Sequence, residues 1–205
     1  MIEQGAVAVV EPELTHRVVR ERTAACHQQL DKLLSNELDL YTPAGYRAFL
    51  TLMLRARCRY GATLATAATH AKLPDTNSLL CQALREDLAV LAGDAAVQIS
   101  SRVDPEFRQS GVSEAAGVLY VFEGAALGAR FVLKRIQAGP FAKLQLAYLS
   151  CLAGRSASRW RAVTHYLDTA VLDKCQLVAA ANDVFATLIE DARFAARGSL
   201  NGAQK

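Results

Sequence analysis

The sequence of 205 residues lacks the features that mark several broad classes of protein. No stretch approaches the roughly 18 consecutive apolar residues of a membrane span, and the N-terminal segment lacks the basic start and apolar core of a signal peptide. The net charge of +3 is too small to indicate a nucleic-acid partner. We therefore expect a cytoplasmic protein that binds neither a membrane nor nucleic acid.

Cysteine motifs are also lacking. The five cysteines form an odd, widely scattered set without a Cys-x-x-Cys pair: Cys26, Cys58, Cys81, Cys151 and Cys175. This pattern argues against a disulfide framework and against a structural zinc site. We interpret them as small buried thiols.

The sequence has no convincing alternating strand pattern, and helical periodicity dominates it. With 52% hydrophobic and 21% charged residues, the composition is that of a folded chain. We predict an all-α fold, a bundle of about seven helices in one domain spanning residues 12–197, between a flexible N-terminus at 1–11 and a flexible tail at 198–205. The expected helices cover residues 12–34, 42–67, 75–91, 113–137, 141–152, 156–172 and 174–196. Such bundles commonly place cofactor sites between facing helices.

Histidine is scarce, so each of the four can be considered individually. We expect His16 and His70 to be exposed and His165 to be half-buried at the surface. His27 differs, because it lies three residues before Leu30 and so on or beside the apolar face of the first helix. An imidazole in this position is either a hydrogen-bonded core residue or a metal ligand.

Two further residues share one side of the first helix with His27. Thr23 precedes it by four residues and Arg20 by seven, which places Arg20 about 10.5 Å away along the helix axis. A metal-binding nitrogen with a cation two turns away suits a flat ligand that has a central metal and carboxylates at its edge. Haem is such a ligand.

The helix expected at 113–137 contains Gly124 and Gly128, four residues apart. Each glycine inside a helix costs about 1 kcal/mol relative to alanine, so a close approach of some group is indicated. Either a second helix packs there, or the bare backbone lies against a planar macrocycle. We interpret Trp160 as a core residue and expect Glu123 to point outward or to cap a neighbouring helix.

Two segments resemble motifs of one enzyme family. RERTAACHQQLDKLL, at residues 20–34, is similar to the proximal-helix signature of haem oxygenases, and GVLYVFEGAALGARFVLKR, at 117–135, resembles the distal helix of their bacterial, biliverdin-producing branch. The motifs lie in the order and at roughly the spacing seen in that family. The resemblance implies an all-α haem-oxygenase fold, with haem between the first helix and the glycine-containing distal helix.

The resemblance also implies roles for individual residues. His27 is expected to bind the iron, and Arg20 to bind a haem propionate. Thr23, in the same motif, is also expected to be a haem-binding residue. Tyr120 is expected to lie near the haem, and the catalytic distal contacts are expected at Gly124, Gly128 and Ala125, which directly follows Gly124. The mammalian-type enzymes carry an Asp at the position of Ala125 and the bacterial ones usually a Ser, so the polar group of the family is missing there.

The implied activity cleaves haem, which is both substrate and cofactor, to biliverdin, CO and iron. It requires O2 and an external electron donor such as a reductase, ferredoxin or ascorbate, and a downstream biliverdin acceptor is a further possible partner. One alternative is a non-catalytic haem-binding or interaction protein of the same fold. Another is a helical scaffold without a cofactor, in which the glycines serve close packing and His27 is a satisfied core residue.

Overall fold

The computed structural model describes residues 13–92, 111–138 and 146–202, and all regular elements in these ranges are helices. This confirms the all-α prediction. In chain order they are α1 (Thr15–Lys32), a short π-helical segment η1 (Leu33–Glu37), α2 (Pro43–Arg59), α3 (Gly61–His70), α4 (Asn77–Ala92), α5 (Val112–Gln137), α6 (Ala147–Thr169) and α7 (Lys174–Gly202). Expectations for residues 1–12, 93–110, 139–145 and 203–205 lie outside the described residues.

Helix boundaries agree with the prediction where the capping chemistry is strong. The Thr42 side chain accepts a hydrogen bond from the Gly45 N–H at 3.1 Å, and Pro43 follows at the first helical position of α2. Elsewhere two expectations were wrong. The helix expected at 42–67 is interrupted at Tyr60 and forms α2 and α3. Conversely, α6 runs unbroken through Gly154, because one exposed glycine costs a helix only about 1 kcal/mol.

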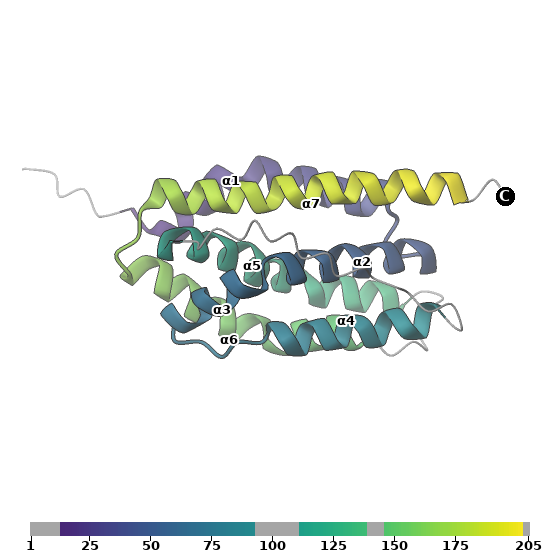
Figure 1. Cartoon of the computed structure of the whole chain (residues 1–205), viewed down its shortest axis with the longest axis horizontal. Coiled ribbons are helices and arrows are strands. Elements are labelled where there is room, and N and C mark those ends of the chain that lie inside the picture. Colours follow the sequence, from purple (N-terminus) through teal and green to yellow (C-terminus); the bar gives the residue numbers. More distant parts are fainter. Residues whose placement is uncertain (1–12, 93–110, 139–145, 203–205) are drawn as a thin grey trace, which may run out of the picture.

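The helices pack around α5, which lies in the middle of the molecule (Figure 1). α5 packs closely against α6 and α7, and also against α3. Its N-terminal half is fully buried from Ala115 to Phe122. α1 lies beside α7 and also contacts α6, but does not pack closely on α5.

By length and composition α5 could cross a membrane, since an 18-residue window within it has a mean hydropathy of 1.5. The expectation that no stretch would reach this level was therefore wrong. However, 56% of that window is buried inside the fold. The apolar character of α5 is thus explained by its position as the core helix.

The expectation of buried thiols holds for only part of the set. All five cysteines are free; Cys81 is buried, Cys175 is exposed and the other three are half-buried.

A buried carboxylate fixes the start of α6. Asp87 of α4 accepts hydrogen bonds from the N–H groups of Ala147, at 2.8 Å, and Tyr148, at 3.1 Å. The Tyr46 hydroxyl of α2 donates a third, at 3.3 Å. A carboxylate at a helix N-terminus is favourable, yet burial has the larger effect and raises the pKa of Asp87.

This shift predicts a pH dependence of stability. The folded-state pKa of Asp87 lies above its ordinary value of 3.8, so its contribution to the free energy of unfolding is fully present below pH 3.8 and lost as the pH rises through the raised pKa. Denaturant unfolding of the wild type and of Asp87→Asn, measured across this window, should show the wild type losing stability relative to the variant as the pH rises. A relative gain would contradict burial as the dominant cause.

Candidate functional site

His27 lies on the surface of α1, with 57% of its side chain exposed. Its ring meets that of Phe185 of α7 edge-on, at 5.8 Å between centroids. His27 Nδ1 is 3.1 Å from a carboxylate oxygen of Asp31, one turn later. A hydrogen bond at Nδ1 leaves the lone pair of Nε2 free to bind a metal. The exposure does not support the interpretation of His27 as a satisfied core residue.

Thr23 and Tyr120 bring α1 and α5 together one turn before His27. Both side chains are buried, and the Thr23 hydroxyl also donates to the Val19 carbonyl at 2.8 Å. Burial raises the pKa of the Tyr120 hydroxyl, while a hydrogen bond with Thr23 and the positive charge of Arg20 offset part of that effect. Arg20, Thr23 and Tyr120, which the resemblance implies to be haem-binding residues, are therefore close together.

The contact between Thr23 and Tyr120 also places His27 relative to Gly124. The two helices run in the same direction (Figure 1), and His27 and Gly124 each lie four residues beyond the contacting pair. Four residues correspond to about 6 Å along a helix axis. The imidazole and the first distal glycine therefore lie at the same level of the bundle.

The two distal glycines have different surroundings. A Cβ atom added at Gly124 would lie 3.4 Å from Cζ3 of the Trp160 ring, which is ordinary contact. A Cβ atom added at Gly128 would meet no atom of the described residues within 4 Å. The close-packing role belongs to Gly117 instead, where a Cβ atom would lie 2.3 Å from the Leu177 carbonyl oxygen of α7. Helix packing therefore does not explain Gly128.

An exposed apolar face surrounds Gly128 on the C-terminal half of α5. Leu127 is 45% exposed and Phe131 is 66% exposed. Together with Gly124 and Gly128 they share one side of the helix by spacing. Ala125 is exposed as well and offers no polar group.

Trp160 and Glu123 lie differently from what the sequence suggested. Trp160 is half-buried rather than a core residue, and its ring packs on that of Tyr120 at 5.4 Å between centroids. Glu123 does not point outward, since its carboxylate lies 2.7 Å from Nε of Arg159 on α6. No local pattern could have indicated this pair, because its members are far apart in sequence.

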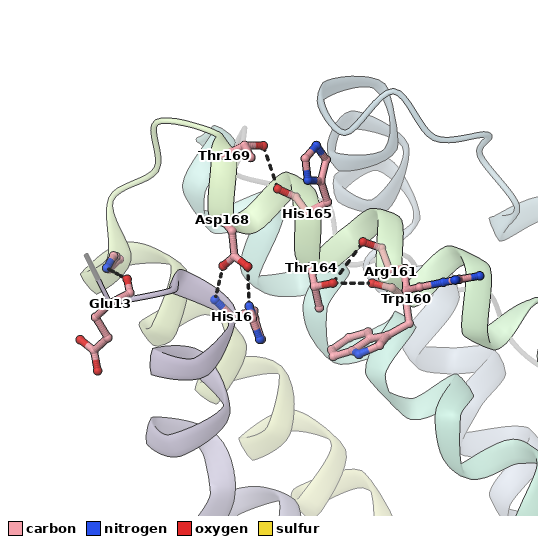
Figure 2. A network of polar contacts seen from close by, with 9 residues as sticks. Glu13, His16, Trp160, Arg161, Thr164, His165, Asp168 and Thr169 are labelled. Atoms are coloured by element: carbon pink, nitrogen blue, oxygen red, sulfur yellow. Dashed lines mark hydrogen bonds and ion pairs between the residues drawn. The ribbon is translucent and has the colours of Figure 1, made fainter. Parts of the chain in front are cut away.

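His16 is not freely exposed either, and its contacts tie α1 to α6. The backbone N–H of His16 donates to one carboxylate oxygen of Asp168 at 3.0 Å, and the ring Nδ1 of His16 lies 2.5 Å from the other oxygen. Figure 2 shows this pair near the C-terminal end of α6, on the same helix as Trp160. The pair holds the start of α1 in place.

The described residues contain no group of three or more His, Cys, Asp or Glu side chains that could hold a metal ion.

Solved structures of two bacterial proteins resemble this fold. The NO- and CO-bound haem oxygenase from Neisseria meningitidis matches with a TM-score of 0.72 and 20% sequence identity, over 90% of this chain and 93% of that chain. Haem oxygenase-1 from the cyanobacterium Synechocystis sp. PCC6803, in complex with haem, matches with a TM-score of 0.68 and 14% identity, over 93% of this chain and 96% of that chain. No protein-family model and no curated protein matches the sequence significantly. The chain thus has the haem oxygenase fold.

The contrast between the glycines predicts opposite effects of one substitution. Gly128→Ala should raise the free energy of unfolding by about 1 kcal/mol, because alanine favours the helix and the added methyl group meets no neighbour among the described residues. Gly117→Ala should lower it by about 1–3 kcal/mol through overpacking against α7. Urea denaturation measures both. A destabilised Gly128→Ala variant would mean that another segment packs on Gly128.

Proposed function

We propose that the chain is a haem oxygenase, which binds haem between α1 and α5 and cleaves it to biliverdin, CO and iron. The observation that carries the proposal is the exposed His27 imidazole, whose Nδ1 faces Asp31, at the same level as the distal glycines and the exposed apolar face around Gly128. The haem oxygenase fold supports it independently.

The residues present fit haem in both shape and chemistry. His27 would bind the iron through Nε2, and the exposed Arg20 two turns earlier would pair with a propionate. On the other side, Gly124 and Gly128 offer backbone without side chains. Leu127 and Phe131 supply apolar surface that a macrocycle would remove from water.

When bound, haem supplies the oxygen activation and is itself the molecule that is cleaved, with O2 and electrons from an external donor. The chain's own residues orient and shield it. Asp31 holds the Nδ1 side of His27 and so fixes the ring and its tautomer. The Tyr120 hydroxyl, whose ordinary pKa of 10.0 is raised further by burial, is protonated at neutral pH and can donate a hydrogen bond.

A second candidate function is haem binding without turnover. It is favoured by Ala125, which carries no hydroxyl or carboxylate at the position where the resemblance leads us to expect one. In the enzyme, ordered water held by backbone carbonyls would replace the missing side chain. In a carrier or sensor, no such replacement is needed.

Titration of the ligand-free chain with ferric haem tests the binding step. The wild type should give a Soret shift with one equivalent, whereas His27→Ala should lose it, because the iron would have no axial nitrogen. Added imidazole should restore the band. The matched control is His70→Ala, an exposed histidine at the end of α3. Unchanged binding by His27→Ala would contradict the assigned ligand.

Addition of ascorbate or a reductase to the haem complex tests turnover. We expect the haem absorption to fall as biliverdin appears, with the product identified by chromatography. Gly128→Ala should slow this reaction while the ligand-free variant remains stably folded, because the new methyl group enters the proposed site. Haem absorption that persists with reductant present would refute catalysis and favour the carrier.

A further inference from the structure

A half-buried ion pair lies beside the first distal glycine. The carboxylate of Glu123 and Nε of Arg159 are 2.7 Å apart, and their side chains are 11% and 12% exposed. Glu123 directly precedes Gly124, and Arg159 directly precedes Trp160. Gly124 and Trp160 are themselves in contact, at the edge of the indole ring. The ion pair and the glycine–indole contact are therefore adjacent links between α5 and α6.

Arg159 also reaches a third part of the fold. Its Nη1 donates to the Pro74 carbonyl at 2.9 Å, in the segment between α3 and α4. The hydrogen bond of Nη1 is directional, whereas Nε meets Glu123 as an ion pair without a hydrogen bond of good geometry. The side chain thus holds α5, α6 and the connection before α4 in one arrangement.

The pair is poorly accessible to bulk water. It borders a small pocket, partly open to solvent, which Thr76 and Cys151 also line. Removing one partner of a buried pair leaves the other charge uncompensated. The local structure should therefore respond to loss of either residue.

Other polar contacts of α6 in the described residues lie closer to its ends, and Arg130 of α5 donates to the Ala153 carbonyl at 3.0 Å, two turns before Trp160. Asp87 binds the N–H groups at its first turn, and Asp168 binds His16 near its last. Trp160 lies between these anchors. The ion pair of Arg159 with Glu123 lies directly beside Trp160, so it can set the rotation of α6 at that residue.

We propose that the Glu123–Arg159 ion pair is a positioning element, which holds the Trp160 indole against Gly124 and Tyr120 and thereby fixes the space beside the distal glycine. The consequence for haem cleavage rests on the proposed function. The positioning itself is a property of the ligand-free chain.

Trp160 is the single tryptophan of the sequence, so intrinsic fluorescence reports its surroundings directly. In the ligand-free chain, Glu123→Gln should shift the emission to longer wavelength and increase quenching by acrylamide, with the far-UV circular dichroism unchanged. Glu190→Gln, at an exposed position of α7, is the matched control and should leave both quantities unchanged. Wild-type emission and quenching in a folded Glu123→Gln variant would overturn the proposal.

Arg159→Lys provides a second test of the proposal, which can be used even if Glu123→Gln does not fold. Lysine keeps the charge but loses the fork, so we expect the same changes in emission and quenching, smaller in size. In the double variant of Glu123→Gln and Arg159→Lys the two effects should not add, because both act through one interaction. Additive effects, or no effect of Arg159→Lys, would contradict a joint role.

The haem complex links the ion pair to the reaction. Glu123→Gln should still bind ferric haem through His27, but biliverdin formation should slow by on the order of 10- to 100-fold, as expected for a small displacement near a reacting centre. An unchanged rate would contradict this link. If the wild type does not bind haem, the proposed function fails, whereas the fluorescence of the ligand-free chain still decides whether the ion pair positions Trp160.

Discussion

The contact of Thr23 with Tyr120 is the constraint on which the candidate site depends. It joins α1 and α5, which do not pack closely on each other. Because the two helices run in the same direction, this contact and the packing of α1 on α7 and α6 together set which residues face one another further along. One turn later are His27 and Gly124. The contacts of His16 with Asp168 and of His27 with Phe185 keep α1 on α6 and α7, so that α1 is supported without covering the apolar face of α5.

The two halves of α5 have different roles in the fold. The N-terminal half is the core of the bundle, where Gly117 permits close contact with the α7 backbone. The C-terminal half carries Leu127 and Phe131, exposed apolar side chains that the described residues do not cover. Exposure of such side chains costs solvation free energy, and large exposed apolar patches often mark binding sites. One helix therefore anchors the fold and presents the surface to which we assign haem.

Much of the fold follows from local sequence, but the site follows only in part. Helical periodicity and the cap at Thr42 and Pro43 were sufficient to predict α2, whereas the break at Tyr60 carries no strong local signal. Spacing placed Arg20, Thr23 and His27 on one side of α1. It could not show that Thr23 is buried and His27 exposed, because α7 and α5 decide which part of that side is covered. The pair of Glu123 and Arg159 and the position of Trp160 depend on the packing of α5 against α6, which local patterns do not encode.

The central claim is that Nε2 of His27 and the bare backbone of Gly124 and Gly128 face opposite sides of one bound macrocycle. A crystal structure of the chain grown with ferric haem tests it most directly. The account predicts iron bonded to His27 Nε2, with the other face of the ring against residues 124–128 and the ring covering Leu127 and Phe131. Haem bound elsewhere, or iron held by another side chain while these residues stay exposed to solvent, would contradict it.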